Sequence, residues 1–376
     1  MVSVRKRRWQ TKGATLTAWI VDYRDNAGIR RQRTFSLKRS ADRFMVQLNN
    51  ELSDASHVAA SQSVTVEQAC KLWVERTERL QLERSTYDDY EQVARLHIIP
   101  LIGNIKLIDL TEARIERFRD ELLDTRSYDR ASRALLHLKM ALEDARRIGL
   151  TSKNPAKDVR IKGRARHRSD VEILSKKELV SFLGAAKDTG ERENAFAHLL
   201  LAGMRASEIR GLPWENTMLD AGTVHVRQRA DRWGKLGPPK TRTSRRAVPL
   251  TPSGVSALKV WRDKSGGGEL VFPHHTGRPL YYSEVIVSIF DPIMFAANLT
   301  TIGRDGKIRH RYSLHAFRHT AASILIELGV SAKRVSRILG HSSIQTTFDL
   351  YGHLIDLRHS EAEMMQQVED ALRDGD

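Results

Sequence analysis

The sequence predicts a multidomain protein that is mainly α-helical and carries small β elements. Its 376 residues are too many for one ordinary hydrophobic core, because single cores usually stop growing near ~250 residues. Alternation of apolar and polar residues dominates the N-terminal end, helical periodicity dominates the middle, and the C-terminal half mixes the two patterns. We therefore expect an N-terminal ββ(β)α module, an all-helical module and a mixed α+β module, in that order.

The N-terminal module is expected over residues 1–55. Apolar and polar residues alternate over Leu16–Tyr23, a turn pattern follows at Asp25–Gly28, and a second extended run ends at Phe35. This arrangement is typical of a β-hairpin. A short helix is expected to start at Ser40.

Positive charge is concentrated in this module, which holds 12 Lys or Arg against 5 Asp or Glu. It opens with a basic run made of Arg5, Lys6, Arg7 and Arg8. The whole chain has 62 Lys or Arg, 46 Asp or Glu and a formal net charge of +16, which suggests a polyanionic partner. Charge alone does not distinguish DNA from RNA or from anionic lipid. The small polar residues 56–63 are expected to form a linker.

The second module, over residues 64–152, is expected to be all helical. Thr65 and Gln68 match a capping box, in which two side chains three residues apart satisfy each other's backbone amides at a helix start. This helix should reach about Leu80. Further helical periods run through residues 86–97, 111–123 and 131–148.

A basic segment, residues 153–172, is expected to link the second module to the third. Seven Lys or Arg stand against one acidic residue between Lys153 and Arg168. The segment is either a solvated linker or a strap along a phosphate backbone. Its candidate phosphate contacts are Lys162, Arg164 and Arg166.

The third module is expected over residues 173–356. Ser175 and Glu178 repeat the capping pattern at its start. Helical periods then alternate with strand patterns at Thr223–Ala230 and Arg246–Leu250.

The chain has no segment that matches a membrane span or a secretory signal. Apolar stretches such as Ala195–Ala202 are far shorter than the ~20 residues that cross a bilayer, so we expect a cytoplasmic protein without membrane contact. The single cysteine, Cys70, excludes an intramolecular disulfide and a thiolate metal cluster. It is expected to be a buried helix residue.

Two short motifs bring charged residues to one helix face. An apolar helix breaks at Gly203, after which Arg205 and Glu208 stand three residues apart. Taken alone, this pair could be only a surface ion bridge. In the second motif, a helix that starts after Ser313 brings His315 and Arg318 together.

His315 and His319 also have the i, i+4 spacing of a zinc-binding pair. Ala316, however, occupies the position where a metalloprotease needs its glutamate base. We therefore discount a metal site and expect no metal and no cofactor.

Six residues follow one another in a specific order along the third module: Arg205, Lys240, His315, Arg318, His341 and Tyr351. Their flanks are equally specific. They read Gly-Met-Arg-x-Ser-Glu, Pro-Lys-Thr ahead of Arg-x-Val-Pro-Leu, His-x-x-Arg-His-Thr, and Leu-Gly-His-Ser ten residues ahead of the tyrosine. With these motifs the sequence resembles the tyrosine recombinase (phage integrase) family.

Each of these residue types suits phosphoryl transfer. Guanidinium groups bind two phosphate oxygens with fixed geometry, which fits Arg205 and Arg318 to the charge that develops on an attacked phosphodiester. A phenol with an ordinary pKa of about 10 needs a positive field and a proton acceptor to attack well. The resemblance implies that Tyr351 is this nucleophile and that His315 accepts its proton.

The remaining roles also follow from the resemblance. Lys240 would protonate the departing 5′ oxygen, with Lys235 in the same turn as the weaker rival. His341 would hydrogen-bond the phosphate, although it could instead cap a helix that begins near Ser342. Glu208 would brace its neighbours, or bond Arg205 or Arg210 for structural reasons only.

Two further histidines stand near the motifs. We expect His319 and His353 to orient or pack other residues rather than to act in catalysis.

The resemblance extends to the other modules. The N-terminal module is similar to the arm-type DNA-binding domain of phage and island integrases, through the spacing of Trp19, Tyr23, Gly28, Arg33, Thr34, Phe35 and Ala41. The helical module resembles the family's core-binding (SAM-like) domain, and the third module its catalytic domain. The first basic run and the interdomain segment are accordingly our candidate DNA contacts.

The activity that the resemblance implies is site-specific DNA recombination, for the integration or excision of a mobile element. Tyr351 would join a DNA 3′ phosphate and release a 5′ hydroxyl, without ATP or a metal. The implied partners are double-stranded DNA at attachment sites and three further copies of the chain, in a homotetramer. A DNA-bending host factor and a directionality factor are further candidates, in the nucleoid of a bacterial or phage-infected cell.

The C-terminal tail, residues 357–376, is expected to form an amphipathic helix. Its apolar residues with helical spacing are Met364, Met365, Val368 and Leu372. The tail either packs on its own domain or, as the resemblance implies, is exchanged with a neighbouring protomer.

Two alternatives to a recombinase remain at this point. A type IB topoisomerase shares these residues but acts without a second site, and the arm module argues against it. A DNA-binding regulator built on an inactive recombinase would lack part of the six-residue set, which is intact here.

Overall fold

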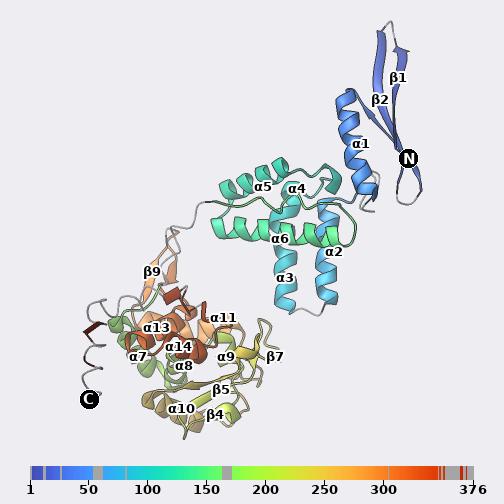
Figure 1. The fold of residues 1–376 in the computed structure, drawn as a ribbon. Helices are drawn as coiled ribbons and strands as arrows, with labels where there is room; N and C mark the ends of the chain where they lie inside the picture. The colour runs from blue at the N-terminus through green and yellow to red at the C-terminus, as the bar shows by residue number, and fades with distance from the viewer. Residues whose placement is uncertain are drawn as a thin grey trace. The chain divides into compact units, whose positions relative to one another are not determined.

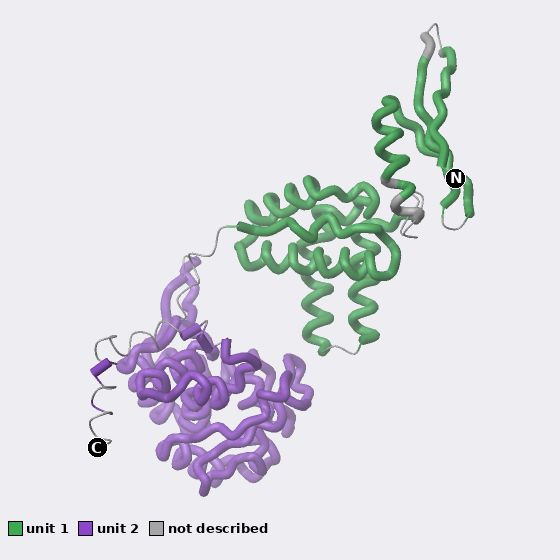
Figure 2. The backbone as a smooth tube through the Cα atoms, in the orientation of Figure 1, with its two compact units in different colours: residues 1–163 green, residues 164–376 purple. Residues whose placement is uncertain are grey.

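The computed structural model describes residues 2–11, 14–25, 28–53, 62–80, 83–162, 172–303, 305–345, 347–348, 350–351, 365–366 and 370. The chain divides into two compact units, residues 1–163 and 164–376 (Figure 2). The division falls inside the basic segment that was predicted as a linker. The expected linker at residues 56–63, apart from its last two residues, and the expected tail helix, apart from residues 365, 366 and 370, lie outside the described residues.

The N-terminal module is a three-stranded antiparallel sheet with one helix (Figure 1). The strands are β1 (Ser3–Thr11), β2 (Ala14–Arg24) and β3 (Arg30–Phe35), in this spatial order, and the helix is α1 (Lys38–Ser53). A small separate core forms where Val21 and Tyr23 of β2 meet Ala41 and Leu48 of α1. The helix begins two residues before the expected Ser40 and runs for 16 residues. Ala41 and Leu48 lie two helical turns apart on one face of it, and both pack on the sheet.

The rest of the first unit is helical, as predicted. Its elements are α2 (Val66–Arg79), α3 (Arg84–Val93), the π-turn η1 (Ala94–Ile98), α4 (Ile99–Ile102), the 3₁₀ turn η2 (Leu107–Asp109), α5 (Glu112–Thr125) and α6 (Tyr128–Arg147). The capping box at the start of α2 is confirmed: Thr65 Oγ1 accepts from the Gln68 amide at 3.2 Å, and Gln68 Oε1 accepts from the Thr65 amide at 2.9 Å. Cys70 lies buried on α2, and burial raises the pKa of its thiol to about 12.

The second unit packs helices and short strands around a large core and a smaller cluster that contains Tyr351. Its first half contains α7 (Lys176–Thr189), α8 (Glu191–Leu201), α9 (Ala206–Arg210), η3 (Trp214–Asn216), β4 (Thr217–Met218), β5 (Thr223–Val226), β6 (Arg229–Ala230), β7 (Leu236–Gly237), η4 (Arg242–Ser244) and β8 (Arg246–Pro249). Its second half contains α10 (Pro252–Lys264), α11 (Tyr282–Val285), η5 (Ile286–Phe290), α12 (Asp291–Ala296), β9 (Thr300–Ile302), β10 (Ile308–His310), α13 (Leu314–Glu327) and α14 (Ala332–Leu339).

The strands of this unit form one small sheet and two hairpins. The sheet has the order β4-β5-β8, and the hairpins are β6-β7 and β9-β10. The strand expected over Thr223–Ala230 is therefore two strands. Val224 and Val226 face the core and pair with β8, after which the chain leaves the sheet and Gln228 Nε2 donates to Gly211 O at 2.9 Å.

The capping box predicted at Ser175 is confirmed in detail. Ser175 Oγ accepts from the Glu178 amide at 3.3 Å, and Glu178 Oε2 accepts from the Ser175 amide at 2.9 Å. This capping box fixes the first turn of α7.

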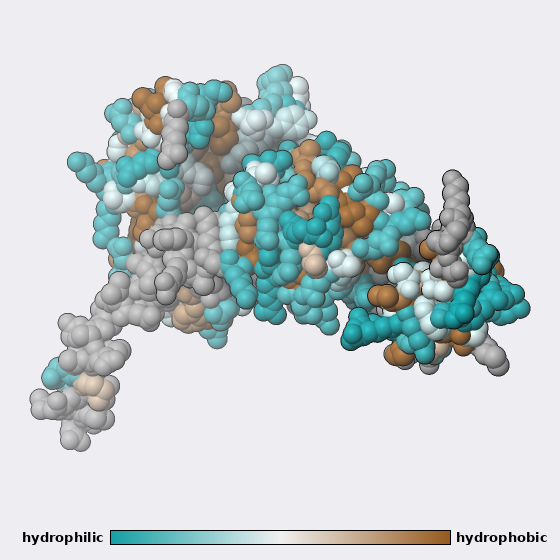
Figure 3. All heavy atoms as spheres, turned by 90° about the horizontal axis from the view of Figure 1, so that it is seen from above, coloured by the Kyte–Doolittle hydropathy of each residue, from teal (hydrophilic) through white to brown (hydrophobic). Residues whose placement is uncertain are grey.

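Hydrophilic residues cover most of the face displayed in Figure 3. Among the residues that the structure describes, no helix has the length and apolar character needed to cross a bilayer.

Candidate active site

The candidate catalytic residues come from several places in the second unit. Arg205 stands at the start of α9, His315 and Arg318 lie in the first turns of α13, and His341 follows α14. The connection between α8 and α9 depends on Gly203, whose φ of +79° is left-handed. A Cβ atom there would lie 2.6 Å from Leu339 Cδ2, so a glycine allows α14 to approach this turn.

Arg205 is fixed by contacts on both sides of its guanidinium. Its Nη1 donates to Glu208 Oε1 at 2.7 Å and its Nη2 donates to Gly340 O at 2.9 Å. Glu208 Oε2 also accepts from the Arg205 backbone amide at 2.9 Å. The predicted Arg205–Glu208 pair is thus present, in the form of a capped helix start.

Glu208 makes a second ion pair that the sequence motifs did not single out. Arg246 donates two hydrogen bonds of 2.9 Å to its carboxylate, and the two side chains are only 3% and 2% exposed. Arg246 Nε also donates to Ile338 O at 2.6 Å. Burial alone would raise the pKa of Glu208, but hydrogen bonds and charge from Arg246, with Arg205, outweigh it and lower that pKa.

Arg318 is almost completely buried, with 2% of its surface exposed. Its Nη1 donates to Gly203 O at 2.6 Å and its Nη2 donates to Leu339 O at 2.5 Å. Burial, with the nearby charges of Arg205 and Arg246, lowers the pKa of Arg318 to about 9. The guanidinium is still protonated at neutral pH. A phosphate anion beside it would offset the electrostatic repulsion from Arg205 and Arg246.

Tyr351 is buried against α13 and α14, and 1% of its surface is exposed. Its hydroxyl forms a hydrogen bond with His319 Nδ1. The contact comes from His319 rather than from His315, the acceptor that the resemblance implies. Burial raises the pKa of Tyr351 to about 12, although the charge of Arg318 acts in the opposite direction.

The two histidines of α13 contact each other. The rings of His315 and His319 are perpendicular, with centroids 4.6 Å apart. Burial, and to a lesser extent His315 and Arg318, lowers the pKa of His319 to about 4. His315 is exposed to solvent, yet desolvation and the charges of Arg318 and Arg205 lower its pKa as well.

His341 is oriented by the segment that follows it. Its Nδ1 lies 2.8 Å from Thr347 Oγ1, and its backbone amide donates to Ser336 O at 3.0 Å. Burial, followed by the charges of Arg318 and Arg205, lowers the pKa of His341 to about 4.

Lys240 and Arg205 line one cavity of about 230 Å³. Ser244, Gly340 and Ser342 also line it. The rival Lys235 lies in the turn of the β6-β7 hairpin, with its amide donating to Asp231 Oδ1 at 2.8 Å. The structure therefore brings Lys240 to the arginine cavity and leaves Lys235 outside its described lining.

The candidate DNA contacts of the first unit are surface residues where the structure describes them. Arg5, Lys6, Arg7 and Arg8 are all exposed on β1. Lys6 Nζ lies 5.8 Å from the ring centre of Trp19, in a cation–π contact. Lys162 is exposed, whereas Arg164 and Arg166, like His353, lie outside the described residues.

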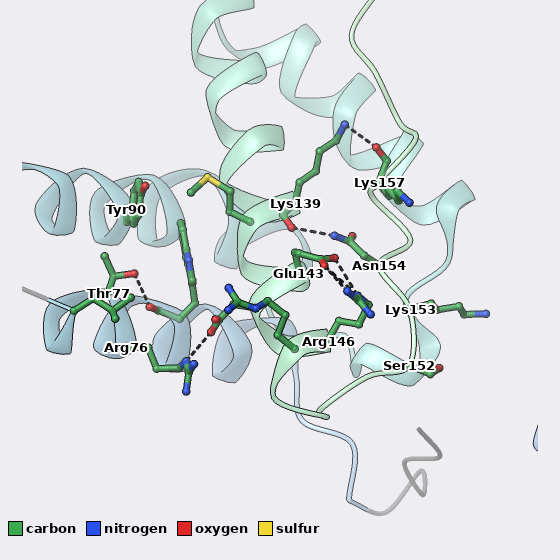
Figure 4. Close-up of a pocket in the computed structure, with 15 residues that line it drawn as sticks. Arg76, Thr77, Tyr90, Lys139, Glu143, Arg146, Ser152, Lys153, Asn154 and Lys157 are labelled. Carbon is green, nitrogen blue, oxygen red and sulfur yellow. Dashed lines mark hydrogen bonds and ion pairs between the residues drawn. The ribbon is translucent and has the colours of Figure 1, made fainter. Parts of the chain in front are cut away.

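A basic cleft of about 930 Å³ was not predicted (Figure 4). It opens in the helical part of the first unit, between α2, α6 and the loop that follows α6. Trp73 and Tyr90 stack at its base with ring centres 4.5 Å apart. Its basic lining residues are Arg76, Lys139, Arg146, Arg147, Lys153 and Lys157.

Part of the charge in this cleft is balanced internally. Arg146 is paired with Glu143 at 2.7 Å, and Arg76 with Asp144 at 3.0 Å. Lys153 belongs to the basic segment that was predicted as a linker or strap.

Within the described part of the chain, no group of three or more His, Cys, Asp or Glu side chains could hold a metal ion.

Comparison with known proteins gives a consistent result. The model of the phage integrase family matches residues 172–358, and that of the phage integrase N-terminal SAM-like domain matches residues 65–123. Tyrosine recombinase XerC of Xylella fastidiosa (strain M23) is 35% identical over 187 residues, which are 48% of this chain and 56% of that protein. The chain thus spans about half the length of this relative. Prophage integrase IntR of Escherichia coli (strain K12) is 26% identical over 321 residues, 78% of this chain and 77% of that protein.

Solved structures share the fold at low sequence identity. The Tn1549 transposon integrase in complex with transposon right end DNA has a TM-score of 0.67 at 19% identity, and the match covers 82% of this chain and all of that chain. A lambda integrase tetramer bound to a Holliday junction has a TM-score of 0.59 at 19% identity, with coverage of 86% and 93%.

Proposed function

Since the chain belongs to the phage integrase family, we propose that it is a site-specific DNA recombinase that breaks and rejoins strands through Tyr351. The observation that carries the proposal is the common anchoring of both arginines. Arg205 donates to the carbonyl of Gly340 and Arg318 to that of Leu339, so adjacent residues of one turn hold the two guanidinium groups. Two oxygens of one phosphodiester can therefore meet both groups.

In the proposed reaction, the Tyr351 oxygen attacks the phosphorus of a DNA strand while its proton passes to a histidine of α13. Charge then develops on the non-bridging oxygens, where the two arginines stabilise it. Lys240, on the lining of the cavity with Arg205, donates a proton to the departing 5′ oxygen. The products are a 3′-phosphotyrosyl bond and a free 5′ hydroxyl, which attacks in the reverse step to rejoin a strand.

Glu208 supports this site through its neighbours. Its carboxylate bonds both Arg205 and Arg246, so it fixes the direction of the Arg205 guanidinium. His341, half-buried and bonded to Thr347, is proposed as a further phosphate donor.

The proposed substrate is double-stranded DNA at the attachment sites of a mobile element. The exposed cations of β1 would bind arm-type DNA, and the basic cleft would bind phosphates near the core site, together with Lys162, Arg164 and Arg166. Lambda integrase forms a tetramer on a Holliday junction, and we propose the same assembly here, with exchange of the C-terminal tail. A DNA-bending host protein, a directionality factor and a location at the bacterial nucleoid complete the proposal.

The alternative functions have less support. A topoisomerase needs no arm module, whereas this chain has a candidate arm module in the N-terminal sheet with its exposed cations. An inactive regulator would not need Arg205 and Lys240 to line one cavity, or Arg205 and Arg318 to be anchored on adjacent carbonyls.

The test is the replacement Tyr351→Phe, which removes one hydroxyl and little volume. A nicked suicide substrate with the attachment site releases a short 5′ fragment after cleavage and traps the protein on the DNA 3′ end. We expect the wild type to give a covalent adduct on a denaturing gel, with peptide mapping at Tyr351, and the variant to give none. Tyr312→Phe, on another buried tyrosine, is the control and should still form the adduct. An undiminished adduct from Tyr351→Phe would disprove the proposal.

A further inference from the structure

Three aromatic side chains lie together at the site: His315, His319 and Tyr351. Resemblance assigns the proton acceptor role to His315, but the hydrogen bond to the Tyr351 hydroxyl comes from His319 Nδ1. We propose that His319 is the catalytic proton acceptor for Tyr351 during DNA cleavage. The inference rests on the proposed function and adds a reacting residue to it.

The geometry of α13 makes His319 a fixed partner. Its neighbour Arg318 is anchored to Gly203 O and Leu339 O, on two different segments. The helix therefore cannot rotate without breaking these bonds. Tyr351 is held from the other side by its packing against Leu339 and Ile326, so both members of the hydrogen bond are positioned by the core.

The electrostatic surroundings keep His319 neutral and hence able to accept a proton. It faces His315 and Arg318 on α13, the Tyr351 hydroxyl, and His341 in the loop after α14, whose own pKa is lowered in part by His319. Burial is the largest cause of the lowered pKa. A neutral imidazole with its proton on Nε2 presents a lone pair at Nδ1, which is the atom that faces the phenol.

The same surroundings would disfavour the imidazolium product. A bound phosphodiester changes this balance, because its negative charge offsets the repulsion from Arg318. Proton transfer should therefore accompany formation of the P–O bond rather than precede it. The phenol O–H group becomes a strong acid only as its oxygen bonds to phosphorus.

Each proton in this step has a defined origin and destination. The O–H bond of Tyr351 breaks and its proton moves to His319 Nδ1, while the phenol oxygen forms a bond to phosphorus. The bond from phosphorus to the 5′ oxygen breaks, and this oxygen takes a proton from Lys240. In rejoining, the imidazolium of His319 returns its proton to the departing phenolate.

His315 then has another place in the reaction. It is exposed and meets His319 edge-on, at 4.6 Å between ring centres. We assign it to the phosphate side of the site, where its charge-bearing neighbours are Arg205 and Arg318.

The experiment compares His319→Asn with His315→Asn in the full chain. Asn retains an acceptor oxygen near the position of Nδ1, so the hydrogen bond and the fold should survive while proton transfer is lost. His275→Asn, on an exposed histidine far along the chain from the motifs, controls for the removal of an imidazole. Thermal unfolding of each variant checks that it is folded.

The measured quantity is the rate of adduct formation against pH. The substrate is a duplex with the attachment site and a bridging 5′ sulfur at the cleavage position, so the leaving group needs no acid. We expect the wild type, His275→Asn and His315→Asn to reach a plateau near neutral pH, the last at a reduced rate. His319→Asn should be slower by on the order of 100-fold at neutral pH, with a rate that rises about tenfold per pH unit because hydroxide must replace the missing acceptor.

The outcomes separate the acceptor role from the nucleophile. A plateau retained in His319→Asn, or a steady rise with pH in His315→Asn instead, would overturn the inference while leaving Tyr351 as the nucleophile. Absence of an adduct from the wild type would overturn the proposed function, and the inference with it.

Discussion

At the scale of single residues, Glu208 illustrates how much one carboxylate can organise. It is 2% exposed and bonds the guanidinium groups of Arg205 and Arg246 together with a backbone amide. A buried charge with this many partners is stable only while the partners are present. The position of Arg205 consequently depends on Arg246 as well, because both arginines bond the same carboxylate.

Replacement of Arg246 by Met tests this dependence. The change leaves the Glu208 carboxylate buried with one arginine instead of two, and breaking a buried pair costs about 3–5 kcal/mol. We expect the free energy of unfolding to fall by an amount in this range, measured by urea denaturation followed by tryptophan fluorescence.

The adjacent Arg245 supplies the control, because it is exposed. Arg245→Met should change the free energy of unfolding by less than ~0.5 kcal/mol. Equal effects of the two substitutions would contradict the structural role given to Arg246.

The sequence motifs predicted most of the candidate site, but not the contacts that select among histidines. The order and flanks of the motifs predicted one shared site, and the structure brings Arg205 to one cavity with Lys240 and to adjacent carbonyl anchors with Arg318. His319 and Arg246 were visible within the same motifs, yet their roles depend on partners far away in the chain, at Tyr351 and Ile338. Such contacts are set by the packing of α13, α14 and β8, which local patterns do not encode.

At the scale of elements, sequence patterns predicted those features that depend on interactions between residues close together in the chain. Both capping boxes, at Thr65 and Ser175, occur as predicted, because each needs only residues three positions apart. The hairpin β9-β10 was missed. Its cross-strand pair, Ile302 and Ile308, is exposed at 75% and 60%, so it lacks the alternation of a half-buried strand.

The turn between α8 and α9 is the element on which the arginine sites depend most. Gly203→Ala would place a methyl group 2.6 Å from Leu339 Cδ2 in a left-handed conformation, and would displace the carbonyl that accepts from Arg318. We expect a loss of about 2 kcal/mol or more in the free energy of unfolding and slower adduct formation.

Gly266→Ala is the matched control for this substitution. Gly266 has a similar φ of +75°, but a Cβ atom added there would meet nothing within 4 Å. It should show only the backbone cost of about 1 kcal/mol and a normal cleavage rate. If both variants cleave equally well, the carbonyl of Gly203 is not important for Arg318.

At the scale of the whole molecule, the separate hydrophobic cores suggest that different modules have different functions. The N-terminal module has its own small core of Val21, Tyr23, Ala41 and Leu48, apart from the cluster that fills the helical part. We propose that residues 1–63 provide a second DNA site and take no part in the chemistry.

A truncated protein that starts at Val64 tests this division. It should form the Tyr351 adduct on a core attachment site at a rate close to that of the full chain. It should also lose binding to arm-type DNA and fail to integrate in a two-site recombination assay, because the exposed cations of β1 are removed with the module. A folded truncation that no longer cleaves the core site would refute the assignment.

The anchoring of the arginines has a consequence for how such an enzyme can change over time. Three of their hydrogen bonds end on the main-chain oxygens of Gly203, Leu339 and Gly340, and every amino acid supplies such an oxygen. Substitution of a side chain cannot remove these acceptors, so it can weaken them only by altering the path of the chain. In the proposed recombinase, the surfaces that contact DNA can therefore diverge toward new target sites, while the anchors of the two arginines persist with the backbone.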